Sequence, residues 1–583
     1  MQYRILAEAY ARIESTSGLL EKTQILSSLL RESPPKEVSR LVALSLGKLH
    51  PDWMGTPEIG IAEKTAVQVV AAAASVSEAK VREEARKTGD IGAAAEVLLG
   101  RSAQGALLIE EPTASFVYDT LDATAKISGQ GSSREKTAKL TGLLSSSSPL
   151  EAKYILRTVL GDLRLGLGDI IMIDALAVAF AGDKAASDEV ERAFNVCSDL
   201  NHVAEVLALQ GIQAVKSIKA EVGTPIRVMA AKKLATTTEI MQKVGQRALA
   251  EYKYDGERIQ VHKDRETIAL FSRRQERITD QYPDVVESVR QNIAANRCIV
   301  EGECVAIDPS TGKMRPFQEL MQRRRKTDVD RMKELVPAGI FFFDILYLED
   351  RDVTALPMLE RRSLLEKIVR KSDRVNLTTG EIIDNPEGLS TFFQRAVESG
   401  AEGIIAKAVH KESSYQAGSR SWLWIKLKAS YQEGLSDTVD LVIVGALYGR
   451  GKRTGVYGAI LASVYDPDSD TYPTVCKIGT GFTDEVLTEL KQRLEKHMLE
   501  RRNPKVLADV EADVWFDPQI VIEVIGDQIT QSPVHTAGRG KVEGGGLAIR
   551  FPRFTGRWRD DKGPTQATTV DDIVDMFERQ HER

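Results

Sequence analysis

Residues 248–263, ALAEYKYDGERIQVHK, place a lysine in a run that alternates as a β-strand does. With a period of two, Glu251, Lys253 and Asp255 share one face of that strand. A lysine amine is a nucleophile only when it is deprotonated, so a catalytic lysine needs a pocket or cationic neighbours that lower its pKa. Taken alone, Lys-x-Asp-Gly is more often a hairpin turn, here at Gly256, than a site of chemistry.

Further charged residues stand in or beside apolar, strand-like runs, where an unpaired charge is costly. They are Glu301 and Glu303 in CIVEGECVAID, Glu402 and Lys407 in AEGIIAK, and Lys426 and Lys428 in WLWIKLK. Carboxylates suit Mg²⁺ or a ribose hydroxyl, and lysines suit phosphates. Each pair is also typical of a solvated strand face. The aromatic run Phe341 to Phe343 is typical of a core, although one ring could stack on a purine. Together these residues indicate a nucleotide site.

The elements that would position these residues fall into three parts. Residues 1–222 carry Ala- and Leu-rich stretches at helical spacing, which predict an all-α domain. Residues 223–431 have short β-branched and aromatic runs with turns and a few helices, which is an α+β pattern. Residues 432–583 have apolar runs at short intervals, as in a small β-barrel, with one helix in residues 484–502. Because 583 residues are too many for one core, a multidomain chain is expected.

Composition limits the classes of partner and compartment. The 78 Lys and Arg residues against 84 Asp and Glu residues give a formal charge of -6, so a polyanionic partner would need local basic surfaces. The four cysteines form no CxxC pair, which argues against a zinc site and a disulfide framework and fits a reducing cytoplasm. The N-terminal stretch does not resemble a signal peptide, and no segment approaches the roughly 18 uninterrupted apolar residues of a membrane span. The sequence therefore predicts a cytoplasmic protein without a membrane partner.

A glycine cluster in the helical part has two interpretations. In YILRTVLGDLRLGLGD, Gly161, Gly166 and Gly168 lie close to Arg157 and Arg164. Backbone amides and arginines at a helix terminus can bind the phosphates of a nucleic acid backbone. The same pattern is equally typical of a glycine-rich turn between two helices.

Seven segments in order, KYDGER, FSRR, VEGECVA, FFFDILYL, EGIIAK, WIKLK and RWRDDK, resemble the motif series of ATP-dependent DNA ligases, most closely the archaeal type. The series extends from Lys253 to Lys562, and EAKYILRTVLGDLRLGLGD resembles the helical DNA-binding domain of that family. Any one motif is short, whereas seven in order are highly specific. The resemblance implies an all-α N-terminal DNA-binding domain, an α+β nucleotidyltransferase (adenylation) domain and a C-terminal OB-fold β-barrel.

The resemblance also implies a reaction. Lys253 would attack the α-phosphate of ATP, release pyrophosphate and become a lysyl-AMP. The adenylate would then move to the 5′-phosphate of a DNA nick, and the 3′-hydroxyl would expel AMP and join the strand. Such phosphoryl transfers ask mainly for positioning and for cations on the developing oxygen charge, so ATP and Mg²⁺ are the implied cofactors.

Matching the motifs residue by residue assigns the remaining roles, all of them contacts with the nucleotide, the metal or DNA. The residues are Glu251 to read the adenine and Phe343 to stack on it, Arg258 and Arg273 for the nucleotide or nick phosphate, Glu303 and Glu402 for the ribose and metal, Arg420, Lys426 and Lys428 for the phosphates, Arg559 and Lys562 for the pyrophosphate, and Arg157 and Arg164 for DNA. The last motif, FPRFTGRWRDDK, has one residue more than the common family pattern, so Arg557 competes with Arg559.

The implied partner is nicked duplex DNA, encircled by the three domains and bound through its phosphates and minor groove without sequence reading. The protein is expected to act as a monomer in DNA replication, repair and recombination. The run Arg323 to Lys326 is either one local basic surface or a solvated run of charges. Docking on a sliding clamp would follow from the family, but no clear motif supports it, because Gln104 and Leu107 are followed by Glu110 and Glu111 where an aromatic pair is needed.

Four other functions remain open on the residues alone. An RNA ligase or a capping guanylyltransferase shares the lysyl-nucleotide strategy, although the large helical N-terminal region argues against both. An NAD-dependent ligase lacks support because the cysteines do not have the spacing of its zinc cluster. A non-catalytic nucleic-acid-binding scaffold would use the charged strands only to bind phosphate, and it would form no covalent intermediate.

Overall fold

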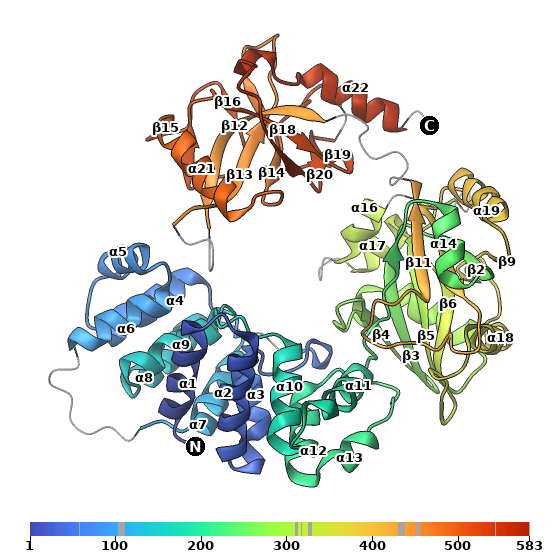
Figure 1. The fold of residues 1–583 in the computed structure, drawn as a ribbon, viewed down its shortest axis with the longest axis horizontal. Coiled ribbons are helices and arrows are strands. Elements are labelled where there is room, and N and C mark those ends of the chain that lie inside the picture. Colours follow the sequence, from blue (N-terminus) through green and yellow to red (C-terminus); the bar gives the residue numbers. More distant parts are fainter. Residues whose placement is uncertain are drawn as a thin grey trace. The chain divides into compact units, whose positions relative to one another are not determined.

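The computed structural model describes residues 1–56, 59–102, 111–308, 313–315, 317–324, 329–429, 438–449, 455–542 and 544–581 (Figure 1). The chain divides into two compact units, residues 1–427 and 428–583. Gln104, Leu107 and Glu110, which were considered for a clamp motif, lie outside the described residues, as do Arg325 and Lys326. No helix in the described part of the chain is long and apolar enough to cross a membrane.

The N-terminal part of the first unit is helical, as the sequence predicts (Figure 1). Its helices are α1 (Tyr3–Ser15), α2 (Leu19–Glu32), α3 (Val38–Leu46), α4 (Glu63–Ala73), α5 (Glu78–Thr88), α6 (Ile91–Ser102), α7 (Ala114–Ala125), α8 (Ser132–Ser145), α9 (Pro149–Val159), α10 (Asp169–Phe180), α11 (Ser187–Cys197), α12 (Leu200–Gln210) and α13 (Ile212–Lys216). Local signals set their ends. At α9, Ser148 and Glu151 form a reciprocal capping box and Pro149 occupies the first turn.

The glycine cluster is a turn between α9 and α10. Gly161 and Gly166 both have positive φ, 69° and 60°, a backbone conformation that glycine adopts without a steric penalty. Lys22 from α2 donates to the Leu165 carbonyl at 2.5 Å inside this turn. A lysine of the same domain thus binds the backbone of this turn. The structure therefore favours the interpretation as a turn between two helices.

The two arginines near this turn are held inside the domain. Arg157 is 4% exposed and donates to Asp90 at 2.8 Å and to Glu14 at 3.0 Å. Arg164 donates to Asp162 at 2.9 Å and lies 3.3 Å from Asp90. Arg157 is thus buried and paired, which argues against its predicted contact with DNA, because a buried, paired cation is not free to meet a phosphate. Arg164 is only half-buried, and its contact with DNA stays a prediction.

The second part of the first unit contains two mainly antiparallel sheets (Figure 1). One has the order β1-β11-β10-β2-β9 and the other β4-β3-β5-β6-β7, with β8 pairing β6. The strands are β1 (Lys232–Lys233), β2 (Ala248–Lys253), β3 (Glu257–Asp264), β4 (Thr267–Ser272), β5 (Arg297–Ala306), β6 (Ala338–Leu348), β7 (Arg351–Asp352), β8 (Val375–Leu377), β9 (Gly380–Ile383), β10 (Gly403–Ala408) and β11 (Trp424–Lys428).

Helices cover these sheets and confirm the predicted α+β pattern. Helix α19 packs on β2 and β10 and also against α14, whereas α18 packs on β6 and α15 on β4 and β6. The helices of this part are α14 (Thr237–Val244), α15 (Pro283–Asn292), α16 (Phe317–Leu320), α17 (Val329–Leu335), α18 (Met358–Ile368) and α19 (Pro386–Glu398).

The basic run that was a candidate DNA surface begins with a buried residue. The Arg323 side chain has no exposed area and makes two hydrogen bonds, at 2.6 and 2.8 Å, to Asp284 at the start of α15. Its guanidinium carbon also lies 4.8 Å from the centroid of the Tyr282 ring. Arg323 is therefore a structural cation that ties its segment to α15, and it does not belong to a basic surface.

The segment that leads from the helices into the sheets is fastened to β3. His262 is buried and neutral, because burial lowers its pKa to about 3. Its Nδ1 accepts from the Gly223 amide at 2.9 Å. Gln260, on the same face of β3, accepts from the Ile226 amide at 2.8 Å and donates to the Ile226 carbonyl at 3.0 Å. These bonds occupy the backbone groups of a connecting segment that has no sheet partner of its own.

The second unit is a β domain with a curled, mostly antiparallel sheet, in agreement with the predicted barrel (Figure 1). Its elements are β12 (Val439–Tyr448), β13 (Tyr457–Ser463), β14 (Tyr472–Ile478), α21 (Asp484–Glu495), β15 (Met498–Leu499), β16 (Val506–Leu507), β17 (Val514–Phe516), β18 (Val521–Ile525), β19 (Gln528–Ser532), β20 (Gly546–Arg550), β21 (Arg553–Trp558) and α22 (Val570–His581). Helix α21 confirms the predicted helix, and α22 was not predicted.

The last motif contains a β-bulge. Ile522 lies opposite Trp558 and Val524 opposite Phe554. Between these two pairs, β21 therefore contains more residues than β18. Gly556, inside this stretch, has a φ of 94°. The bulge therefore places two additional residues of β21 before the final charged residues of this motif.

Candidate active site

A cavity of about 210 Å³ in the first unit gathers most of the predicted site residues. Residues from both sheets line it, together with the segments after β4 and before β11. Among them are Glu251 and Lys253 from β2, Arg258 from β3, Arg273, Glu303 from β5, Phe343 from β6, Lys407 from β10, Arg420, and Trp424 and Lys426 from β11. Glu251 and Lys253 share a face of β2 as predicted, whereas the rings of Tyr252 and Tyr254 pack on Phe392 and Phe341.

Lys253 is the last residue of β2 and points its amine at a carboxylate. Its Nζ forms an ion pair with Glu402, the residue before β10, whose amide donates to the Lys253 carbonyl at 2.8 Å. Burial acts to lower the pKa of Lys253, but Glu303, Glu402 and Asp255 together outweigh it and raise that pKa above its ordinary value. In the free protein the amine is therefore a protonated ammonium, and not yet a nucleophile.

Glu303 is the second carboxylate beside Lys253. Burial raises its pKa to about 7, with Lys253 and Arg258 acting in the opposite direction. Gly256 makes this close packing feasible. A Cβ at that position would lie 2.3 Å from the Cys304 carbonyl oxygen and 2.9 Å from Glu303 Cγ. The glycine of KYDGER is thus needed for the approach of the chain to β5.

We expect Glu303→Gln to stabilise the protein in the absence of metal and nucleotide at about pH 8. The pKa of Glu303 is about 7 in the folded chain and returns towards 4.5 on unfolding. The folded state therefore holds the extra proton, and its stability falls as pH rises between these two values. Because glutamine has no charge to desolvate, the gain should be about 1–3 kcal/mol near pH 8 and vanish near pH 4. Denaturant unfolding in EDTA at the two pH values measures it, and equal stability at the higher pH would contradict it.

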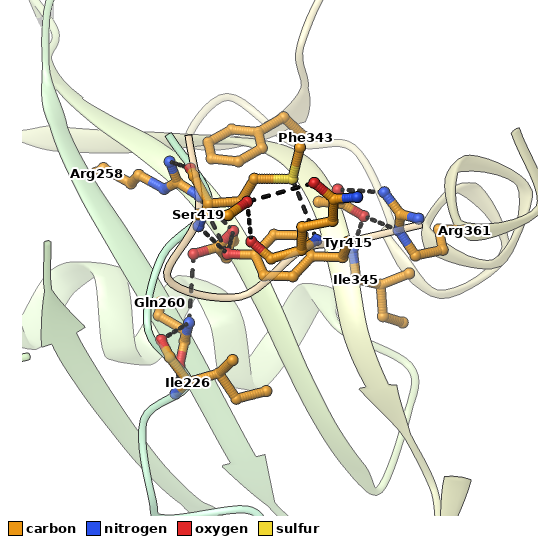
Figure 2. A network of polar contacts seen from close by, with 12 residues as sticks. Ile226, Arg258, Gln260, Phe343, Ile345, Arg361, Tyr415 and Ser419 are labelled. Atoms are coloured by element: carbon orange, nitrogen blue, oxygen red, sulfur yellow. Dashed lines mark hydrogen bonds and ion pairs between the residues drawn. The ribbon is translucent and has the colours of Figure 1, made fainter. Parts of the chain in front are cut away.

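Arg258 lines the cavity and belongs to a buried polar network (Figure 2). It donates to Glu301 at 2.7 Å and to the Met229 carbonyl at 2.7 Å, and Glu301 also accepts from the Tyr415 hydroxyl at 2.9 Å. Its guanidinium carbon is 5.2 Å from the centroid of the Phe343 ring. The Glu301 side chain, which the strand alternation places on the face of Glu303, is thus fully buried and paired with Arg258.

An aromatic corner closes one side of the cavity. The rings of Phe343 and Trp424 meet edge to face with centroids 6.1 Å apart. The Lys407 amine lies 4.9 Å from the first centroid and 4.5 Å from the second, and it donates to the Phe343 carbonyl at 3.0 Å. Cation–π contacts and this hydrogen bond fix the corner before any ligand arrives.

The exposed cations of the site come from two segments. Arg273, directly after β4, and Arg420, before β11, are both exposed and line the cavity. Lys426 lines the cavity from β11. Lys428 follows on the same face of β11 but is not among the lining residues.

The two cations predicted for the pyrophosphate belong to the second unit. Arg559 donates to both oxygens of Asp440 at 2.8 Å, and Lys562 donates to one of them at 2.6 Å. Arg557 is far more exposed, with 63% of its side-chain area accessible, and lies 3.4 Å from Glu523. Arg559 and Lys562 thus share one acidic partner, whereas Arg557 stands apart from them.

The residues beside Lys253 fit a magnesium ion together with a nucleotide. Within the described ranges, no group of three or more His, Cys, Asp or Glu side chains forms a complete metal site. Mg²⁺ is usually held by one or two carboxylates with substrate phosphates and waters, rather than by a protein cage. Glu303 and Glu402, both close enough to Lys253 to raise its pKa, supply that number of carboxylates.

Other residues of the site were not singled out from the sequence. Arg362 from α18 and Thr378 both hydrogen-bond to Glu251, and Tyr415 joins the Glu301 network. Arg362 lies in the sequence MLERRSLLEKI, whose pattern does not distinguish a buried, paired arginine from a solvated one. Lys407 did carry a signal, because it is a charged residue in an apolar strand.

Comparison with known proteins gives matches along the whole chain. Family models match residues 2–177 as DNA ligase N terminus, residues 228–428 as ATP dependent DNA ligase domain and residues 453–562 as ATP dependent DNA ligase C terminal region. DNA ligase 2 of Thermofilum pendens is 48% identical over 100% of this chain and 98% of its own length. The DNA ligase of Hyperthermus butylicus is 46% identical over 100% and 98%. A solved structure titled "Pmar-Lig_Pre." has a TM-score of 0.56 at 16% identity, covers 95% of this chain and 99% of its own, and agrees in fold.

Proposed function

Because the chain belongs to the family of ATP-dependent DNA ligases, we propose that Lys253 is its nucleophile and that the cavity around Lys253 holds ATP. The family activity is the joining of nicked DNA with ATP and a divalent metal ion. One observation carries the assignment of the residue: the Lys253 amine lies beside two carboxylates at a cavity that is also lined by an aromatic corner and by exposed cations. Such a set can hold a base, a chain of phosphates and a metal ion at one nucleophile.

The first step of the proposed mechanism is the activation of Lys253. Its amine must lose a proton before its lone pair can attack the α-phosphate, because the free protein holds it as an ammonium next to Glu402. Mg²⁺ held by Glu303 and Glu402 would supply positive charge that lowers the pKa of the amine and offsets the phosphate charge. Lys253 Nζ then bonds to the α-phosphorus as the bond to the pyrophosphate oxygen breaks, which leaves a lysyl-AMP.

The other cavity residues take the roles that their chemistry allows. Glu251 accepts hydrogen bonds from the base, and Phe343 offers its ring for stacking. Arg273, Arg420 and Lys426 are cations facing the cavity and would hold phosphates in both transfers. Arg258, paired with Glu301, acts mainly by shaping this wall and contributing its charge.

In the last motif, Arg559 and Lys562 are proposed to orient the leaving pyrophosphate after exchanging Asp440 for it. Both cations now donate to Asp440, and Arg559 also pairs with Asp561, whereas a phosphate chain offers both cations more negative charge than Asp440 does. Arg557 remains the alternative. Lys428 is proposed to act on phosphates only in the later transfer to DNA.

The protein is proposed to act on nicked duplex DNA as a monomer in the cytoplasm, in replication, repair and recombination. Arg164, which is half-buried, is proposed to contact DNA, whereas Arg157 is buried and its charge is neutralised inside the helical domain. Sequence-independent binding through phosphates predicts an affinity that falls steeply with salt.

Labelling with nucleotide tests this proposal. The protein is incubated with α-labelled ATP, GTP or NAD and Mg²⁺, and label that survives denaturation is measured. ATP should label the protein, and the labelled protein should then seal nicked DNA better than nicked RNA. Absence of covalent label would favour a non-catalytic scaffold. Preference for nicked RNA would favour an RNA ligase, and labelling by NAD alone would favour the NAD-dependent class.

A further inference from the structure

The base-facing carboxylate of the cavity is held by three donors. Glu251 Oε1 accepts from Arg362 Nη1 at 2.5 Å and from the Thr378 hydroxyl at 2.6 Å, and Oε2 accepts from Lys407 Nζ at 2.5 Å. The Glu251 side chain is 2% exposed, so its hydrogen-bond partners in the protein are these three groups rather than bulk water. Two cations and a hydroxyl that all donate require a carboxylate that only accepts.

The three donors leave a defined acceptor position. Each carboxylate oxygen has about two lone-pair positions. Oε1 has both of them occupied, by Arg362 and Thr378, whereas Oε2 has one occupied, by Lys407. Among the described residues, the remaining acceptor position of Glu251 is therefore on Oε2, beside the amine that also contacts the aromatic corner.

Arg362 does not line the cavity, and it binds Glu251 from outside the cavity wall. It is not among the lining residues, whereas Glu251, Thr378 and Lys407 are. Its guanidinium bridges α18 to this wall, because Nη2 donates to the Thr378 carbonyl at 3.0 Å and Nε to Glu366 on α18 at 2.9 Å. A planar fork held at both ends fixes the plane of the carboxylate that it binds.

The strand opposite Glu251 leaves room for this arrangement. Gly380 of β9 is its register partner, and a Cβ there would lie 3.1 Å from Glu251 Cγ. Gly380 does not have a positive φ, so a glycine is needed here to leave room for the Glu251 side chain and not for a special backbone conformation. The side chain of Glu251 is thus placed by packing on one side and by Arg362 and Thr378 on the other.

From these contacts we propose that Arg362 and Thr378 are positioning residues that set the preference for ATP over GTP. They commit Glu251 to a fixed, acceptor-only state. The 6-position of adenine carries an amine that donates, whereas that of guanine carries a carbonyl oxygen that accepts. A fixed carboxylate oxygen therefore bonds adenine and repels guanine, and a buried acceptor facing another acceptor is costly. This proposal rests on the proposed function, in which Glu251 meets the base.

The test compares nucleotides within each variant. Rates of covalent labelling by α-labelled ATP and GTP at several concentrations give kcat and KM for both, in wild type and in Arg362→Gln, Arg362→Lys and Thr378→Val. Arg395→Gln is the matched control, because Arg395 forms an exposed ion pair with Glu381 on β9 and does not contact Glu251. The measured quantity is the ratio of kcat/KM for ATP to that for GTP.

We expect Arg362→Gln to lower this ratio by about tenfold to a hundredfold, mainly through a higher KM for ATP. Thr378→Val should lower it less, Arg362→Lys should retain part of it because the charge remains, and Arg395→Gln should match wild type. An equal loss with both nucleotides in Arg362→Gln, or an unchanged ratio, overturns the proposal. If Arg362→Gln does not fold, an unchanged ratio in both Arg362→Lys and Thr378→Val overturns it. Failure of the proposed function is distinct, since wild type would then take no label.

Discussion

Lys253→Arg is expected to abolish lysyl-AMP formation and the joining of nicked DNA from ATP. Arginine keeps a positive charge beside Glu402, so it can form an ion pair with Glu402 as Lys253 does. A guanidinium is not deprotonated in proteins, however, and therefore offers no lone pair to the α-phosphate. The loss of a covalent nucleophile should lower the rate of labelling by at least about 10⁴-fold. Incubation with α-labelled ATP followed by denaturation measures it.

A nick that already carries the 5′-adenylate separates chemistry from folding. Joining of this substrate does not use the amine of Lys253 as a nucleophile, so Lys253→Arg should retain most of this activity. Lys243→Arg is the matched control, because Lys243 is exposed on α14 and contacts only the ring of Trp422 among the interactions described. Labelling of Lys253→Arg at the wild-type rate would contradict the assignment of the nucleophile.

Much of the cavity around Lys253 could be predicted from the sequence because most of its charged residues lie on strands. A strand alternates its faces with a fixed period, so Glu251 and Lys253 could be placed together before the fold was known. Charged residues such as Glu303 and Lys407 stand out in apolar runs for the same reason. The order of the motifs then identified the family, which the comparisons confirm.

The errors have one physical cause, the pairing of charges across long stretches of chain. Arg157 is neutralised by Asp90, and Arg323 by Asp284. A cation in a helical sequence has the same local pattern whether it faces solvent or a buried carboxylate. Only the fold shows the carboxylate, so an arginine next to a glycine turn or in a basic run was assigned to DNA or to a surface.

The same reasoning explains why Arg362 was missed. Its neighbour Arg361 anchors α18 to β6, and the helix then carries Arg362 to Glu251. The two residues are adjacent in the sequence and differ only in the direction in which the helix points them. Their functions depend on which carboxylate each one contacts, Asp344 in β6 or Glu251 in β2.

Asp344→Ala is expected to have the largest effect on stability. Asp344 and Arg361 have no exposed side-chain area and form two hydrogen bonds, at 2.8 and 3.0 Å (Figure 2). Arg361 also donates to the Ser413 carbonyl at 3.0 Å. Removal of the aspartate leaves a buried guanidinium without its counter-charge, which should cost about 3–5 kcal/mol. Because Arg362 follows Arg361 on α18, the preference for ATP should fall as well.

Hydrogen exchange of the β6 amides with increasing denaturant measures this loss where it occurs, since a chain of several domains does not unfold in one step. Asp350→Ala is the control, because Asp350 pairs with Arg297 at the surface and is 85% exposed, so its loss should cost at most about 1 kcal/mol. Replacing both partners, Asp344→Leu with Arg361→Met, should recover much of the stability, because no charge then stays buried. The double variant should nevertheless keep the weakened preference for ATP, since an apolar contact cannot fix the orientation of α18 as the paired hydrogen bonds do. Full recovery of both properties would show that burial alone, and not the ion pair, positions Arg362.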